Sequence, residues 1–142
     1  MAVRPTPVGE EGPRHQARER ALSLLYEAEL KGVAPETVLA SLPAPPDPFA
    51  VVLVAGVGVH RARIDALLEQ ASVGWELSRM PVVDRTLLRI ATYELLEQPE
   101  IPVAVVIDEA VELAKQYSTE ESGKFVNGML TTVALVARST SA

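Results

Sequence analysis

The residue types that most often do chemistry in proteins are few in this chain, and they are not grouped. The absence of cysteine excludes disulfides, thiol catalysis and thiolate metal sites. The two histidines, His15 and His60, do not stand in the spacing of metal-binding helices. A phosphate-binding loop would need a glycine at position 118 and Ser or Thr at 125, but these are Ser118 and Phe125. We therefore predict no catalytic residue, no metal site and no cofactor, and hence no enzyme.

A basic cluster near the N-terminus suits contact with phosphates. Arg14 and Arg18 are four residues apart and share a helix face, and Arg20 lies on an adjoining face. Such arginines can contact a nucleic-acid backbone, although helix-borne arginines are equally common where no binding site exists. The net charge of −6 and Glu19, inside the cluster, argue mildly against a general nucleic-acid binder.

The stretch "YSTEESGKFVNGM", residues 117–129, places an aromatic ring in a polar run. Phe125 stands beside Lys124 and shortly after Gly123, a setting in which an exposed ring could stack on an unpaired base. The alternative is a ring that anchors a helix in the core, since phenylalanine is usually buried. The residues alone leave both interpretations open.

Helices are the elements that must position these residues. The 142 residues suit one domain, which we place at 13–138, between a flexible tail at 1–12 and a disordered end at 139–142. The first helix is expected to start at Pro13 and stop at Gly32, and a short helix to cover 35–42. Further helices are predicted over about 78–98 and 102–117, and from near Thr119 to about Arg138.

The apolar segment at 49–71 is the ambiguous one. Its valine run resembles a buried strand, but its length without a turn favours one buried helix. Gly56 and Gly58 would either weaken this helix locally or let another helix approach closely, and Gly128 is expected to let the preceding helix approach. Ser118 and Glu121 fit a capping box for the last helix. No apolar run is long enough for a bilayer span or a signal peptide, so we expect a cytoplasmic protein with no membrane contact.

Three segments resemble one known family, the NusB family of bacterial transcription antitermination factors. They are "ARERALSLLYEAEL", "VDRTLLRIATYELL" and "IPVAVVIDEAVELAKQYSTEESGKFVNGML", and the resemblance runs from about Arg14 to Arg138. It implies an all-α fold of six or seven helices in two packed sub-bundles. Ribosomal RNA cytosine methyltransferases carry a similar helical domain, but this chain has no room for their catalytic domain.

The family implies a non-enzymatic adaptor that binds boxA RNA of ribosomal RNA operons. It does so together with NusE, a ribosomal small-subunit protein, and the complex modifies RNA polymerase so that it reads through terminators. Family members often carry three or four consecutive basic residues where this chain reads "RHQARER". Gly123 also replaces a more usual polar residue.

The resemblance also implies roles for individual residues. The RNA-binding residues would be Arg14, Arg18, Arg20, Glu121, Lys124 and Phe125, and the partner-binding residue would be Asp84. Glu121 would accept hydrogen bonds from base amino groups. The alternative function is a helical interaction module that binds only protein or forms a homodimer, in which the valines at 51–59 could take part.

Overall fold

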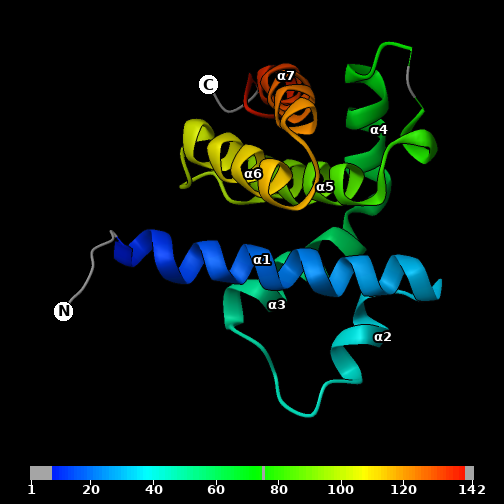
Figure 1. The fold of residues 1–142 in the computed structure, drawn as a ribbon, viewed down its shortest axis with the longest axis vertical. Coiled ribbons are helices and arrows are strands. Elements are labelled where there is room, and N and C mark those ends of the chain that lie inside the picture. Colours follow the sequence, from blue (N-terminus) through cyan, green and yellow to red (C-terminus); the bar gives the residue numbers. More distant parts are fainter. Residues whose placement is uncertain (1–7, 75, 140–142) are drawn as a thin grey trace.

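The structure, a computed structural model, describes residues 8–74 and 76–139, with side chains from residue 12 onward. Every regular element in these ranges is helical, which confirms the predicted all-α class (Figure 1). The elements are α1 (Val8–Lys31), α2 (Pro35–Ala40), α3 (Pro48–Val59), α4 (Arg61–Ala71), the 3₁₀ turn η1 (Leu77–Arg79), α5 (Val82–Glu97), α6 (Val103–Tyr117) and α7 (Glu120–Ala137). None of these helices combines the length and apolar character that a bilayer span requires.

The helices form the two predicted sub-bundles. In Figure 1, α1 crosses the molecule, with α2 and α3 on one side and α5 and α6 on the other. Helices α1, α2 and α3 pack on one another, and α5, α6 and α7 form the second group with α4 against α5 and α7. Both α1 and α3 also contact α5, so one apolar core runs through both groups. The central helix α5 is buried along most of its length because both sub-bundles cover it.

Helix α1 begins at Val8, so the predicted start at Pro13 is wrong. Pro13 lies inside the helix. A proline inside a helix has no amide to donate to the carbonyl four residues earlier, and its ring also clashes with the Cβ of the residue before it. Gly12 has no Cβ, so the second of these obstacles is absent at Pro13. The rest of the predicted tail, residues 1–7, and residues 140–142 of the predicted C-terminal end lie outside the described residues.

The apolar segment is helical, as predicted, but it forms two helices rather than one. The break lies at His60, whose backbone has φ −100° and ψ 17°. Through this bend α3 stays against α1 while α4 reaches α5 and α7. Gly56 confirms the predicted close approach, since a Cβ there would lie within 3 Å of the Tyr93 ring. The valine run divides between faces: Val54 and Val57 are buried, and Val59 is exposed.

The start of α7 differs from the predicted capping box. Thr119 is the N-cap, and its hydroxyl accepts a 2.9 Å hydrogen bond from the Ser122 amide. Ser118 instead ends α6, with φ −132° and ψ −109°. The predicted box fails because the chain leaves α6 one residue later than the Ser-x-x-Glu pattern indicates.

Two glycines of α7 have different surroundings. Gly128 is exposed and has open space around it, so the close approach predicted there is wrong. Gly123 is buried, and a Cβ built on it would lie 2.8 Å from Cγ of Lys115 on α6. The tight crossing of α6 and α7 is therefore at Gly123 near the start of α7, immediately before Lys124 and Phe125 in the sequence.

Candidate nucleic-acid interface

The three arginines of the basic cluster have different surroundings. Arg14 and Arg20 are exposed, whereas Arg18 retains only 4% of its surface. The Arg18 guanidinium donates two hydrogen bonds to the Glu94 carboxylate, at 2.9 and 2.7 Å. The prediction that Arg18 faces phosphate is therefore corrected: its side chain points from α1 into the seam with α5.

The Arg18–Glu94 pair is a buried link between the sub-bundles. Glu94 is 1% exposed, so its carboxylate depends on this guanidinium for charge compensation. Burial by itself would lower the pKa of Arg18, but the hydrogen bond to Glu94 and the charges of Glu94 and Glu109 outweigh it and raise the pKa. Arg18 thus remains a cation that holds α1 to α5. The sequence does not predict this role of Glu94. Its position within a mostly apolar helix is the feature that indicates a buried carboxylate.

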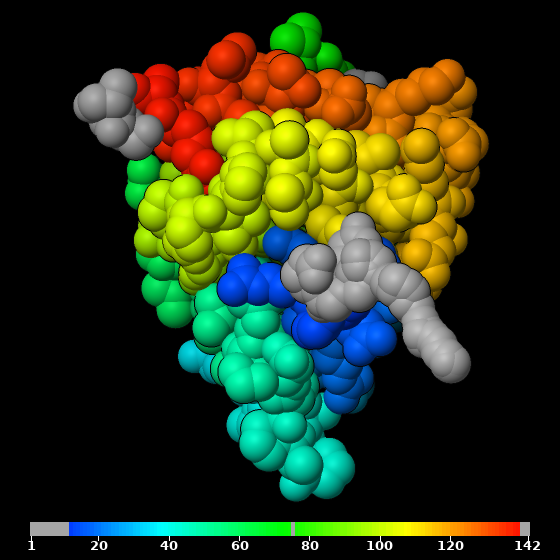
Figure 2. Space-filling model, turned by 90° about the vertical axis from the view of Figure 1, so that its left-hand side faces the viewer, coloured from blue at the N-terminus to red at the C-terminus, as the bar shows by residue number. Residues whose placement is uncertain are grey.

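Arg14 lies at the edge of this seam and stacks on an aromatic ring. Its guanidinium carbon is 4.2 Å from the centroid of the Phe49 ring, at the start of α3. Next to it, His15 Nδ1 lies 2.8 Å from a carboxylate oxygen of Glu109 on α6. Figure 2 shows the beginning of α1, in blue, between the teal of α3 and the yellow of α6. Arg14 is therefore set on the surface where three helices meet.

The polar run at the start of α7 presents charge at the surface. The side chains of Lys124 and Glu121 are 75% and 85% exposed, and Lys124 Nζ lies 3.9 Å from a Glu121 oxygen. Phe125 is half-buried and packs against the apolar core. Its ring thus combines the two predicted alternatives, since one part contributes to the core and another remains at the surface.

Asp84 does not lie on the surface. It is 3% exposed and accepts a 2.8 Å hydrogen bond from the Ser122 hydroxyl, which joins the starts of α5 and α7. Its other oxygen, Oδ1, has no hydrogen-bond partner among the described residues. The expectation that Asp84 contacts a partner directly is therefore corrected, because neighbouring side chains cover the carboxylate.

An apolar groove lies close to Asp84 on the surface. Its volume is about 350 Å³, and it is lined by Glu19, Leu22, Ser23, Tyr26, Val83 and Tyr117. The Tyr117 hydroxyl donates a 2.5 Å hydrogen bond to Glu19, which raises the pKa of the tyrosine and joins α6 to α1. Sequence reasoning missed this groove, because its two tyrosines lie 91 positions apart and only side-chain contacts between α1 and α6 bring them together.

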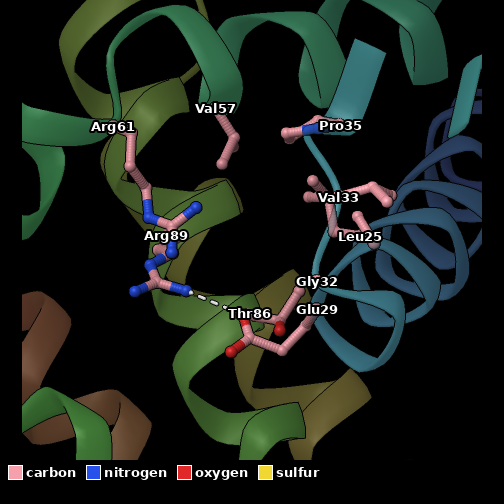
Figure 3. A pocket seen from close by; sticks show the side chains of 10 residues that line it. Leu25, Glu29, Gly32, Val33, Pro35, Val57, Arg61, Thr86 and Arg89 are labelled. Atoms are coloured by element: carbon pink, nitrogen blue, oxygen red, sulfur yellow. Dashed lines mark hydrogen bonds and ion pairs between the residues drawn. The ribbon is translucent and has the colours of Figure 1, made fainter. Parts of the chain in front are cut away.

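A second hollow, of about 190 Å³, lies at the other end of α1 (Figure 3). Arg61, Arg89 and Glu29 point into it from three helices. The Nε atoms of Arg61 and Arg89 lie 3.1 and 2.9 Å from oxygens of Asp65, and Arg89 also lies 3.4 Å from Glu29. Both guanidinium groups are already ion-paired, so the ion pairs that border the hollow join α1, α4 and α5. No group of three His, Asp or Glu side chains that could hold a metal occurs among the described residues.

Comparison with known proteins shows which family this chain resembles. The sequence model of the NusB family matches residues 15–135. The chain is 52% identical over 124 residues to the transcription antitermination protein NusB of Acidothermus cellulolyticus, covering 84% of this chain and 86% of that protein. It is also 52% identical to the protein of the same name from Thermobifida fusca, covering 84% and 87%.

Solved structures share the fold. T. maritima NusB superimposes with a TM-score of 0.77 at 37% identity, covering 85% of this chain and 89% of that one. A crystal structure of antitermination factors NusB and NusE in complex with double-stranded RNA contains a chain with a TM-score of 0.75 at 28% identity, covering 87% and 97%.

Proposed function

Because the chain belongs to the NusB family, we propose that it is a transcription antitermination factor that binds RNA together with NusE. The RNA is the boxA element of ribosomal RNA operons, and the complex acts on RNA polymerase in the cytoplasm. The chain serves as a binding adaptor and not as an enzyme. The relatives' names support antitermination, and a structural neighbour bound to NusE and RNA supports the two partners.

The observation that carries the proposal is the hydrogen bond between Glu19 and Tyr117. It brings the middle of α1 beside the end of α6. The turn that follows Tyr117 leads directly to Lys124 and Phe125, and Arg14 and Arg20 lie on α1 itself. This hydrogen bond links α1, which carries Arg14 and Arg20, to the helix that precedes Lys124 and Phe125, and we propose that an RNA strand follows this path.

Within this path each exposed residue has a role that suits its chemistry. Arg14, Arg20 and Lys124 contact phosphates, and the exposed part of Phe125 stacks on a base. Glu121 accepts hydrogen bonds from base amino groups. Arg18 holds α1 in place from below through Glu94.

We place the NusE contact on the apolar groove beside Asp84, whose edge at Glu19 and Tyr117 borders the proposed RNA path. Tyr26, Tyr117 and Val83 line it, and tyrosines of this kind are enriched in protein interfaces because they bury apolar area and keep a polar group available. Asp84 supports this surface from below through Ser122.

The experiment is a titration of boxA RNA with and without NusE, by fluorescence anisotropy at two salt concentrations. Binding that weakens with salt supports the proposal, because released counterions accompany each phosphate contact. Absence of RNA binding under both conditions would favour the alternative, a module that binds only protein. Sedimentation of the free protein would then show whether it forms a homodimer.

A further inference from the structure

The aromatic ring below Arg14 comes from a different helix. Phe49 lies at the start of α3, and the guanidinium carbons of Arg14 and Arg18 are 4.2 and 5.5 Å from its centroid. One ring therefore faces two of the three arginines of the basic cluster, the exposed Arg14 and the buried Arg18.

Local sequence holds the Phe49 ring in place. Asp47 is the N-cap of α3, and its carboxylate accepts a 2.8 Å hydrogen bond from the Phe49 amide. Pro48, at the first position of the helix, suits the backbone angle required there. Part of the ring packs against the apolar core, so its orientation is set before any ligand arrives.

Stacking leaves the hydrogen-bonding groups of Arg14 available. A guanidinium that lies over a ring is attracted through its face, while its five N–H donors point outward in its own plane. Among the described residues no carboxylate is paired with Arg14. Arg18, in contrast, donates two hydrogen bonds to Glu94, so its guanidinium does not compete with Arg14 for a phosphate.

We propose that Phe49 is a positioning residue for RNA binding: its ring holds the Arg14 guanidinium with its donors directed at a phosphate. This inference rests on the proposed function. Fixing a long side chain in advance reduces the conformational entropy that binding would otherwise cost. Phe49 thus compensates for the short basic run of this chain by making one arginine more effective.

The test is a double-mutant cycle on RNA affinity, with NusE present. Phe49→Leu keeps apolar volume and removes the ring, and we expect it to weaken binding by about threefold to fivefold, the size of an exposed cation–π contact. Phe49→Tyr keeps the ring and should restore affinity to within about twofold. In an Arg14→Ala background, Phe49→Leu should change affinity by less than about twofold.

An equal loss in both backgrounds would overturn the proposal, because the ring would then act through the fold rather than through Arg14. No loss in either background would also overturn it.

A second measurement separates this proposal from the proposed function. In the free protein, ¹⁵N relaxation of the Arg14 side chain should show restricted motion that Phe49→Leu releases. If the wild type binds no RNA, the proposed function fails. The relaxation measurement needs no RNA, so it still tests whether Phe49 restricts the Arg14 side chain. Equal mobility in wild type and Phe49→Leu overturns it.

Discussion

At the scale of single residues, Arg14 and Arg18 show how one helical turn separates two roles. Both belong to α1 and face the Phe49 ring, but only Arg18 reaches the buried Glu94. Removing Arg18 leaves the buried Glu94 carboxylate without a cation to balance its charge. Removing Arg14 leaves no buried charge unbalanced.

Arg18→Met should therefore lower the free energy of unfolding by about 3–5 kcal/mol, the usual cost of breaking a buried ion pair. Arg14→Ala, the matched control, should change it by no more than about 1 kcal/mol, the size of an exposed cation–π contact. Arg14→Ala should also flatten the salt dependence of RNA binding by about one unit. Urea denaturation and RNA titration measure these effects. Equal destabilisation by both changes would contradict the assignment.

Phe125 supplies the second prediction at this scale. Its half-buried ring packs on the core and borders the exposed Lys124. Phe125→Ala should lower stability by less than the roughly 3–5 kcal/mol of a fully buried ring. It should also cost about 1–3 kcal/mol of RNA binding if one base stacks there. Thermal denaturation and RNA titration of this variant test both parts, and loss of stability alone would limit Phe125 to the core.

At the scale of elements, the start of α7 depends on one side chain. Thr119 caps the helix through its hydroxyl, and this first turn carries Lys124 and Phe125 into position. Thr119→Ala should cost about 1 kcal/mol of stability, as loss of an N-cap does. Glu121→Ala, which removes the side chain of the rejected capping box, should cost no more than about 0.5 kcal/mol. Urea denaturation ranks the two, and the reverse order would restore the capping box.

At the scale of the whole molecule, Glu29 connects helices from both sub-bundles. It accepts a 2.9 Å hydrogen bond from Arg85 and lies 3.4 Å from Arg89, which also pairs with Asp65 on α4. Partial burial alone would raise the pKa of Glu29, but the hydrogen bond from Arg85 and the charges of Arg85, Arg89 and Arg61 outweigh it. They lower the pKa below its ordinary value of 4.5.

The depressed pKa predicts a loss of stability in acid. Because the folded state binds the Glu29 proton less readily than the unfolded state, its contribution is complete above pH 4.5 and is lost as the pH falls through the lower folded pKa. Wild type and Glu29→Gln should therefore differ most near neutral pH and converge in acid. Urea denaturation at a series of pH values measures this. A difference that stays constant with pH, as expected for the exposed Glu121→Gln, would contradict it.

Sequence by itself determined the helical class, the order of the helices and the family. These depend on local periodicity, on glycine and proline positions, and on short motifs such as "KFVNG", all of which are readable along the chain. It also marked the residues that remain at the surface, Arg14, Arg20 and Lys124.

Only the tertiary structure decided which polar residues are buried. Arg18 and Asp84 are charged residues of the kind usually found at the surface. In the fold they are buried, and their hydrogen-bond partners lie 76 and 38 positions away in the sequence. The Phe49 ring below Arg14 and the tyrosine groove likewise join distant segments. The physical reason is that burial and ion pairing depend on which helix faces meet, and packing across both sub-bundles determines that.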